Sequence, residues 1–396
     1  GILFSKKIKI TFFSPKHKDL LLIDNIALDW IKKPILEEIE YGFISTRPLN
    51  QEGLYYISFK IIFFFIEGLI KKLNFKTSYV FACVKCVKPK IILENIFDYN
   101  IAHIAKYFPD IKVVILSQGT WFYLSERGKK FRGSSFPIDY GKLEVNNLNN
   151  LYILLWGEKD IDILLDHGVN KKNNGINLIK VGSYEGSFYR EIFDTNDIKY
   201  DLLFISQMHR TTLNSDHVHG KIAVKNTIIA AKLILKYARE NNLSAAFLLR
   251  NKAGNDECEI NLISSINDEG KYFDIIKNKN RSVWRELYRS KVIFSLNSTV
   301  SHDAMALNKK AVLMPLSERY IYKWSSNKFK NDRDFWRWTV EKRDYNNFKN
   351  IVDDIINLDQ QEYEEIIKEK IHYMCYSKDN YSGYKYIRNF LKNFLN

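Results

Sequence analysis

Two carboxylates are candidates for acid–base or nucleophilic chemistry. Glu158 follows the apolar run Tyr152 to Trp156, and Asp216 lies in the polar segment that begins at Gln207. A carboxylate at the end of a strand can act as a general base for an acceptor hydroxyl, and an ionised one can attack an electrophilic carbon. Either residue could instead be a surface acid, and Glu158 would suit the first turn of a solvated helix.

The segment around Asp216 gathers further polar groups. Three histidines, one arginine and one carboxylate fall within the eleven residues 209–219. A hydrophobic core cannot absorb this cluster, so it should face either solvent or a ligand. His217 and His219 have a spacing that could bind a metal, but matched further ligands are missing, so we expect a metal-independent site.

A phosphate site is expected where the apolar run Val292 to Leu296 gives way to small polar residues. Asn297 and Ser298 can cap the helix that follows and present its first N–H groups to an anion. Arginines at 281, 285 and 289 precede this turn and could either add positive charge there or line an exposed helix face. The residues expected to bind the nucleotide or donor are Gln207, His209, Arg210, Arg250, Asn297, Ser298, Thr299, Ser301 and His302.

A third group of polar residues follows the strand expected at Val113 to Ser117. Gln118, Gly119 and Thr120 would lie at the carboxyl edge of a sheet, where open α/β sheets bind ligands. We assign these three residues to the acceptor side of the site.

Short apolar runs separated by helical periodicity position these groups. The expected strands of the first half are Ile8–Phe12, Tyr41–Ser45, Tyr79–Cys83, Val113–Ser117, Tyr152–Trp156 and Leu178–Val181. Helices are expected over 18–32 and 91–107. Strands that alternate with helices indicate an α/β fold with a mainly parallel, doubly wound sheet.

The pattern changes after Gly182, which predicts a domain boundary. Residues 1–182 form a first domain, 183–200 a linker, and 201–360 a second domain that opens with the strand DLLFIS. The second domain continues with a long helix around 224–238, a strand at 246–249 and a helix at 259–266. Residues 361–396 are expected to form C-terminal helices that cross back to the first domain.

Composition favours a globular protein with anionic partners. The chain has 396 residues and 46 % hydrophobic content, and 60 Lys and Arg exceed 46 Asp and Glu. No compact Lys/Arg cluster points to nucleic acid. The four cysteines are expected to be reduced. The N-terminus lacks the features of a signal peptide, and the most apolar window, Leu54 to Ile70, is interrupted by Lys60 and Glu67 and is too short to span a bilayer. We therefore expect a cytoplasmic protein with at most peripheral membrane contact.

The order of the motifs resembles a known enzyme family. Strand-QG at 118–119, WGEKD at 156–160, VGS at 181–183, YDLLFISQ at 200–207 and NST at 297–299 resemble bacterial surface-carbohydrate transferases of the GT-B type. More narrowly, they look like the retaining β-Kdo transferases of lipopolysaccharide and capsule assembly. The resemblance covers about residues 110–315, and the HP and QP signatures of some capsule Kdo transferases are absent.

This resemblance implies a GT-B-like architecture of two Rossmann-like, doubly wound domains that face each other across a cleft. It implies a catalytic acid after the Gly of the WGE-like strand end, here Glu158, and an essential aspartate, for which Asp216 is the candidate. In the implied reaction Kdo passes from CMP-Kdo to a polysaccharide or glycolipid with retention, and no cofactor is needed beyond the nucleotide sugar.

The expected partners are a nucleotide sugar, a glycan or glycolipid acceptor and, peripherally, the inner membrane or a polysaccharide assembly complex. Three alternatives remain open from the sequence. The chain could be a transferase that uses a UDP- or CDP-linked donor, a nucleotide-sugar epimerase on the same fold, or a noncatalytic glycan-binding module.

Overall fold

The computed structural model describes most of the chain, in two compact units. The described residues are 8–23, 31–46, 53–94, 99–117, 123–124, 148–166, 169, 175–193, 197–206, 218–250, 256–266, 273–277, 282–296, 298–316, 322–323, 337–376 and 382–396. The first unit comprises Gly1–Phe122, Lys129–Glu185 and Lys378–Asn396. The second unit comprises Tyr123–Gly128 and Gly186–Ser377.

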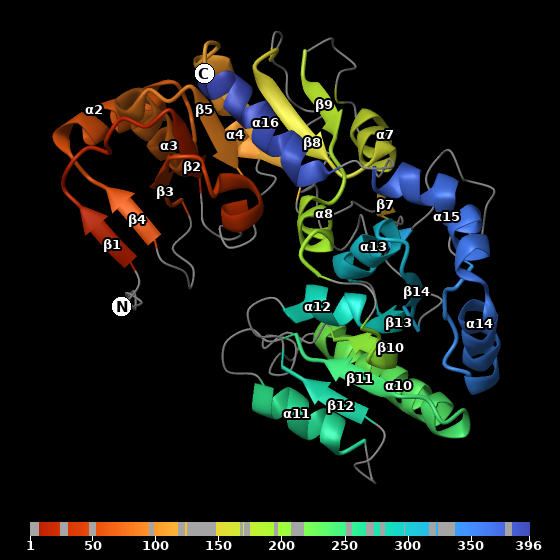
Figure 1. Ribbon diagram of the computed structural model, residues 1–396. Helices are drawn as coiled ribbons and strands as arrows, with labels where there is room; N and C mark the ends of the chain where they lie inside the picture. Colours follow the sequence, from red (N-terminus) through yellow and green to blue (C-terminus); the bar gives the residue numbers. More distant parts are fainter. Residues whose placement is uncertain are drawn as a thin grey trace. The chain divides into compact units, whose positions relative to one another are not determined.

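The first unit is built on a six-stranded sheet with the order β3-β2-β5-β6-β8-β9 (Figure 1). All of its strand pairs are parallel. The strands are β2 (Leu20–Ile23), β3 (Tyr41–Ile44), β5 (Ile91–Glu94), β6 (Lys112–Leu116), β8 (Leu151–Leu155) and β9 (Asn177–Lys180). Its helices are η1 (Lys32–Leu36), α2 (Phe59–Ile70), α3 (Phe75–Val87), α4 (Tyr99–Tyr107), α7 (Glu158–Asp166) and α16 (Gly383–Leu395). The four residues of β2 are all buried, as expected for a strand with helices on both faces.

The first predicted strand forms, but outside this sheet. β1 (Ile8–Thr11) pairs in parallel with β4 (Gly53–Tyr56) in a separate two-stranded sheet. Beyond this pair, the Ile57 amide donates a hydrogen bond to the Thr11 carbonyl oxygen at 2.7 Å. Ser58 then caps α2, because its side-chain oxygen accepts a hydrogen bond from the amide of Ile61.

The second unit contains a five-stranded parallel sheet with the order β12-β11-β10-β13-β14. Its strands are β10 (Tyr200–Ile205), β11 (Ala245–Leu248), β12 (Phe273–Ile276), β13 (Ser290–Ser295) and β14 (Lys310–Leu313). Its helices are α10 (Val218–Glu240), α11 (Asp256–Ser264), α12 (Ser282–Tyr288), α13 (Thr299–Ala306), α14 (Tyr345–Asn357) and α15 (Gln360–Met374), and α8 (Tyr184–Arg190) spans the unit boundary. A short antiparallel pair joins β7 (Tyr123–Leu124) to β15 (Tyr322–Lys323). The predicted parallel α/β class is therefore confirmed for both units.

One buried cluster shows how the second sheet is covered. Trp284 and Leu287 of α12 pack with Leu203 and Ile293 on the sheet. Tyr189 stacks on Trp284 with ring centroids 5.6 Å apart and planes inclined by 12°. This aromatic stack joins α8 to the core of the second unit.

Three predicted elements are wrong in type. Residues 18–32, expected to be helical, contain strand β2, because a short run of Leu and Ile suits a strand buried on both faces as well as a helix. Tyr79–Cys83, expected to be a strand, lies inside α3, where Val80 to Val84 are all buried. The expected helix over 91–107 begins as strand β5, and helix α4 starts only at Tyr99.

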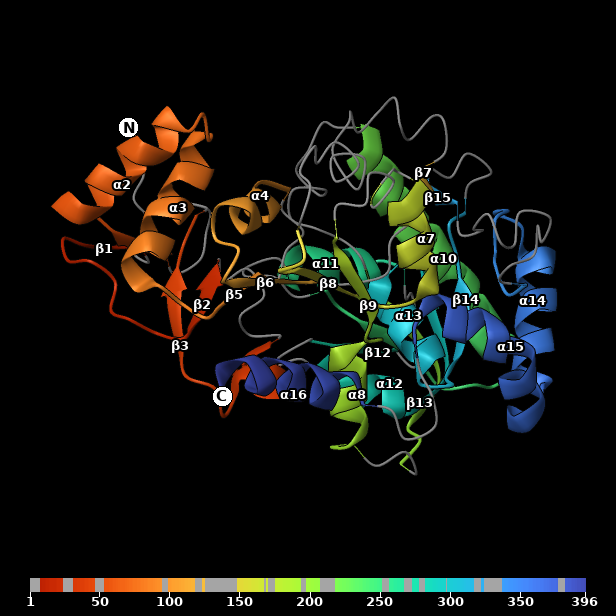
Figure 2. The same cartoon turned by 90° about the horizontal axis from the view of Figure 1, so that it is seen from above.

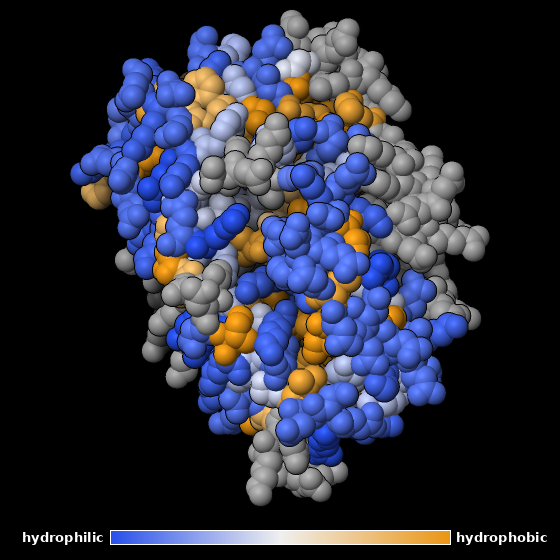
Figure 3. Space-filling view, turned by 45° about the vertical axis from the view of Figure 1, so that its right-hand side comes forward, coloured by the Kyte–Doolittle hydropathy of each residue, from blue (hydrophilic) through white to orange (hydrophobic). Residues whose placement is uncertain are grey.

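The surface is mainly hydrophilic on the face drawn in Figure 3, with hydrophobic residues exposed between the hydrophilic ones. Within the described residues, no helix combines the length and the apolarity needed to cross a membrane.

A close helix contact in the first unit gives a stability prediction. A Cβ atom at Gly68 of α2 would lie 3.0 Å from both Cα and Cβ of Ser78 in α3, so part of the clash is with backbone. We expect Gly68→Leu to lower the free energy of unfolding by about 1–3 kcal/mol, because the two helices must separate. Ile66→Leu on the exposed side of α2 is the control and should change it by less than about 0.5 kcal/mol. Urea unfolding measures both, and equal stability of the two variants would contradict the tight packing.

Candidate functional site

Polar side chains collect where the strands of the first sheet end. Glu94 ends β5, whereas Ser45, Ser117 and Ser183 follow the ends of β3, β6 and β9; all four are buried. The register pairs Ile23 with both Ile44 and Glu94, so these strand ends are level with one another. Parallel α/β sheets bind ligands at this carboxyl edge. The sequence prediction missed Glu94 because it lay inside a segment interpreted as a helix.

Glu158 is the first residue of α7, directly after β8 and its Trp156-Gly157 turn. Its carboxylate Oε2 accepts a hydrogen bond from Lys180 Nζ at 2.5 Å, and both side chains are partly exposed. The site therefore holds a solvent-accessible carboxylate beside a cation at the carboxyl edge. The VGS motif follows Lys180, and Gly182 there adopts a positive φ of 67° that favours glycine.

The two residues after Glu158 are fully buried. Asp160 Oδ2 accepts a hydrogen bond from the Trp156 amide at 3.1 Å and so closes the turn between β8 and α7. Burial lowers the pKa of Lys159 to about 8, and the negative charge of Asp160 partly opposes this shift. The carboxylate of Asp160 is thus engaged in the fold.

At the second sheet, the turn after β13 has the predicted cap. Ser298 precedes α13, and its side-chain oxygen accepts a hydrogen bond from the Val300 amide at 3.3 Å. The Ser298 amide in turn donates to Ser295 Oγ at 3.1 Å, and Ser295 Oγ lies 2.6 Å from Ser301 Oγ. The sequence prediction missed Ser295, the last residue of β13, whose side-chain oxygen holds the capping residue Ser298 through this hydrogen bond.

The other predicted donor-binding residues in this region are placed differently. Thr299 is the first residue of α13. Ser301 and His302 are fully buried, and the Ser301 hydroxyl is already engaged with Ser295. Of the polar side chains described at this turn, that of Ser298 is partly exposed.

Arg250 follows β11 at the same carboxyl edge. Its amide donates a hydrogen bond to Oε2 of the buried Glu259 at 3.3 Å. Burial lowers the pKa of Arg250 and the charge of Glu259 opposes the shift, so a buried carboxylate lies next to this cation.

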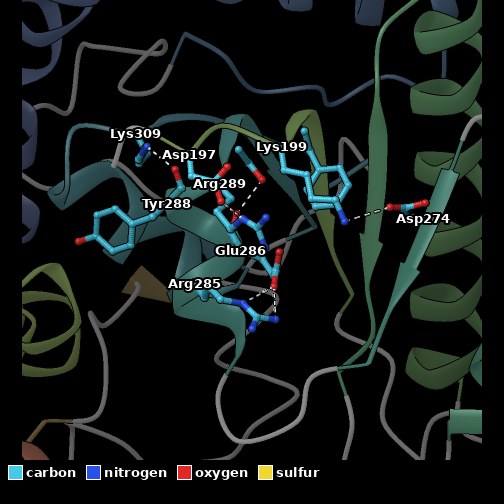
Figure 4. A network of polar contacts seen from close by, with 10 residues as sticks. Asp197, Lys199, Asp274, Arg285, Glu286, Tyr288, Arg289 and Lys309 are labelled. Carbon is cyan, nitrogen blue, oxygen red and sulfur yellow. Dashed lines mark hydrogen bonds and ion pairs between the residues drawn. The ribbon is translucent and has the colours of Figure 1, made fainter. Parts of the chain in front are cut away.

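Two of the arginines expected to assist a phosphate, Arg285 and Arg289, pair with acidic side chains, and Arg281 lies outside the described residues. Arg285 of α12 pairs with Glu286, with Nη2 and Oε1 2.7 Å apart, and Arg289 pairs with Asp197 at 3.0 Å (Figure 4). Arg289 immediately precedes β13, whereas Ser298 follows the end of this strand, so about 20 Å of extended chain separates them. Arg289 therefore lies at the amino edge of the sheet, and both arginines neutralise acidic side chains instead.

Several predicted site residues lie outside the described part of the chain. These are Gln118, Gly119, Thr120, Gln207, His209, Arg210, Asp216 and Asn297. Among the residues that are described, no group of three or more His, Cys, Asp and Glu side chains is arranged to hold a metal ion.

Comparison with family models finds one match. Residues 148–393, more than half of the chain, match a family described as "putative O-antigen biosynthesis protein". This stretch includes the turn with Glu158 and the cap at Ser298. No curated protein sequence matches the chain.

Comparison with solved structures finds similar folds at low sequence identity. MnaA of S. aureus in a co-structure with UDP is 12 % identical, with a TM-score of 0.54 over 96 % of this chain and 97 % of that chain. UDP-GlcNAc 2-epimerase from Neisseria meningitidis, bound to UDP-GlcNAc, is 12 % identical with a TM-score of 0.51 over 94 % and 99 %. The wall teichoic acid polymerase TagF with CDPG is 11 % identical with a TM-score of 0.50 over 95 % and 88 %. This likeness confirms the predicted GT-B-like fold with two Rossmann-like units.

The buried Lys159 gives a pH-dependent prediction. Its pKa is lowered from 10.5 to about 8 in the folded protein, so the unfolded chain binds this proton more tightly. The resulting cost to stability is full below pH about 8 and disappears as the pH rises towards 10.5. We expect Lys159→Met to raise the free energy of unfolding near neutral pH by up to about 3 kcal/mol, with the difference from wild type closing above pH about 8.

Urea unfolding of both proteins across this pH range measures the difference. A gap that stays constant with pH would show that the amine is charged in the folded protein at every pH tested.

Proposed function

We propose that this chain, which belongs to the O-antigen biosynthesis family whose model matches residues 148–393, is a glycosyltransferase. It would move a sugar from a nucleotide donor onto a surface polysaccharide or glycolipid. The GT-B-like fold suits this role, because the ends of its parallel strands offer binding edges in both units.

The observation that carries the proposal is the capped start of α13. Ser298 fixes the first turn of this helix at the carboxyl edge of the second sheet, directly after the buried strand β13. A helix start of this kind stabilises an anion through its N–H groups and its dipole. We propose that it receives the donor's phosphate, so that charge on the departing nucleotide is stabilised without a metal ion.

The proposed donor is CMP-Kdo, on the strength of the sequence resemblance. The similar solved structures hold UDP, UDP-GlcNAc and CDPG, which makes UDP- and CDP-linked donors the alternatives. Each of these nucleotides carries phosphate and would use the same helix start. The base and the sugar distinguish them.

For the chemistry we propose two displacements that together retain the anomeric configuration. The carboxylate of Asp216 attacks the anomeric carbon as the bond to the nucleotide phosphate breaks. The acceptor hydroxyl then displaces Asp216, and its proton passes to Glu158. The Lys180 ammonium lies beside this base, with Nζ and Oε2 2.5 Å apart.

A second candidate activity is the epimerisation of a nucleotide sugar. Several of the similar structures are UDP-GlcNAc 2-epimerases, established or putative, and the TM-scores do not separate these from the polymerase. The two activities differ in one measurable respect, because a transferase needs an acceptor and an epimerase does not.

The assay that follows incubates the protein with CMP-Kdo and with UDP- and CDP-linked sugars, with and without a glycolipid acceptor. We expect nucleotide release that depends on acceptor and continues in EDTA. Conversion of a sugar nucleotide to its epimer without any acceptor would replace the transferase with the epimerase, and a divalent-ion requirement would contradict the metal-free site.

The phosphate site is tested by calorimetric titration with CMP, UDP and CDP. Ser298→Ala should weaken binding by up to about fivefold, because the first turn of α13 loses its cap. Ser244→Ala is the matched control. It removes a hydroxyl that donates to Asp201 Oδ2 at the amino edge of the same sheet, and should leave binding unchanged. Equal effects of the two substitutions would rule out the α13 site.

The role of Glu158 is tested with Glu158→Gln, which keeps the shape of the side chain but cannot accept the proton. We expect turnover to fall by about a hundred- to ten-thousandfold. Glu40→Gln is the control, since Glu40 also pairs with a lysine at 2.5 Å in the first unit but precedes β3 at the opposite edge.

Asp216→Asn should abolish transfer, and a donor-derived adduct should form on Asp216 when acceptor is withheld. Wild-type rates in the variants would end the assignment.

A further inference from the structure

Helix α2 of the first unit exposes an unbroken apolar side. Phe59 is 95 % exposed, Phe63 67 % and Ile70 76 %. At 3.6 residues per turn, the exposed apolar positions of the helix fall within a sector of about 120°. We call this sector the α2 face, and it consists of Phe59, Ile62, Phe63, Ile66, Leu69 and Ile70.

The apolar surface continues beyond the helix at both ends. Phe75, at the start of α3, is exposed, and its ring lies 4.8 Å from that of Phe65. At the other end, Phe12 and Phe13 are exposed after β1. They lie near the start of α2, because Ser14 Oγ is 2.8 Å from Ser58 Oγ at its cap.

The α2 face is already ordered before any partner binds, because the opposite side of the helix is packed. Ile61 and Gly68 are buried there, and α2 packs against α3 through the Gly68–Ser78 contact (Figures 1 and 2). The side chains of the α2 face therefore bind a partner without a folding step and without the entropic cost of one.

The charge around the face is strongly positive. Residues 59–87, which span α2, α3 and the turn between them, contain five lysines and a single acid, Glu67. Glu67 is neutralised, because its carboxylate lies 2.7 Å from Lys85 Nζ and 3.8 Å from Lys71 Nζ. Lys60 and Lys72 are exposed beside the apolar sector, so the face is rimmed by cations.

From this combination we propose that the α2 face docks the protein on an anionic lipid surface. Phe, Ile and Leu side chains would enter the acyl boundary while the flanking lysines pair with anionic headgroups. The twelve residues of α2 extend about 18 Å, less than the hydrocarbon core of about 30 Å, so the helix would lie in the membrane plane. The cationic rim favours this occupant over a second copy of the chain, whose rim would carry the same charge.

The proposal goes beyond the proposed function and is tested without catalysis. Vesicles of phosphatidylcholine, with and without phosphatidylglycerol, are floated with the full chain. We expect binding to the anionic vesicles that weakens as salt is added. The variant Phe59→Ser/Phe63→Ser/Ile66→Ser should reduce partitioning at least about tenfold, since three apolar groups no longer enter the bilayer.

The matched control is Leu165→Ser/Ile192→Ser/Ile198→Ser, which removes three exposed apolar side chains from other surfaces and should bind as wild type. Lys60→Gln and Lys72→Gln should each weaken binding to anionic vesicles by about fivefold, with no effect on neutral ones. Light scattering reports the oligomeric state in parallel.

Three outcomes would overturn the proposal. Wild-type protein could stay unbound, the α2 variant could bind like the control variant, or a wild-type dimer could become monomeric in the α2 variant without vesicle binding. The last outcome would assign the face to a second copy. Each is independent of glycosyl transfer, which is measured with its own acceptor.

Discussion

Parallel pairing of short buried strands is the constraint on which this structure depends. A parallel sheet must return each chain segment to the same starting edge, so every strand end faces the same way. The register that aligns Ile44, Ile23, Glu94 and Ile115 therefore decides which polar side chains become neighbours. Parallel pairing also places the starts of α7 and α13 at the carboxyl edges of the two sheets, since each helix begins within a few residues of a strand end. The position of Glu158 and the cap at Ser298 follow from this geometry.

The sequence predicts strands β10 and β13 of the second sheet and misassigns segments near the beginning of the chain, for one physical reason. DLLFIS and the run before Asn297 are bounded by polar residues on both sides, so β10 and β13 were recognisable as strands. The LLLI of β2 and the buried residues of α3 are both continuous apolar runs. Burial on all sides removes the periodicity that distinguishes strand from helix, so residues 18–32 and 79–83 were assigned to the wrong type.

The candidate site was predictable where it depends on neighbours in sequence. Ser298 caps the helix that directly follows it, and this cap could be predicted from the NST motif alone. Ser295 could not, because its role depends on the hydroxyl of Ser301 folding back to within 2.6 Å. The role expected for Arg285 and Arg289 could not be checked from their own sequence segments. Their ion pairs with Glu286 and Asp197 neutralise their charge. A helix cap between neighbouring residues can be predicted from the sequence, whereas a contact between residues farther apart can be identified only from the structure.

The C-terminal helix α16 belongs to the first unit although the whole second unit precedes it in the chain. Arg388 Nε donates to the Pro34 carbonyl oxygen at 2.8 Å, and Lys392 pairs with Glu38 at 2.6 Å. The rings of Phe390 and Phe394 cover Tyr152 of β8. During synthesis the ribosome therefore exposes residues 186–377 in full before the first sheet can receive its last covering helix. The second unit can therefore finish folding before the first. If the first sheet folds early, one side of β8 remains uncovered until α16 has been synthesised.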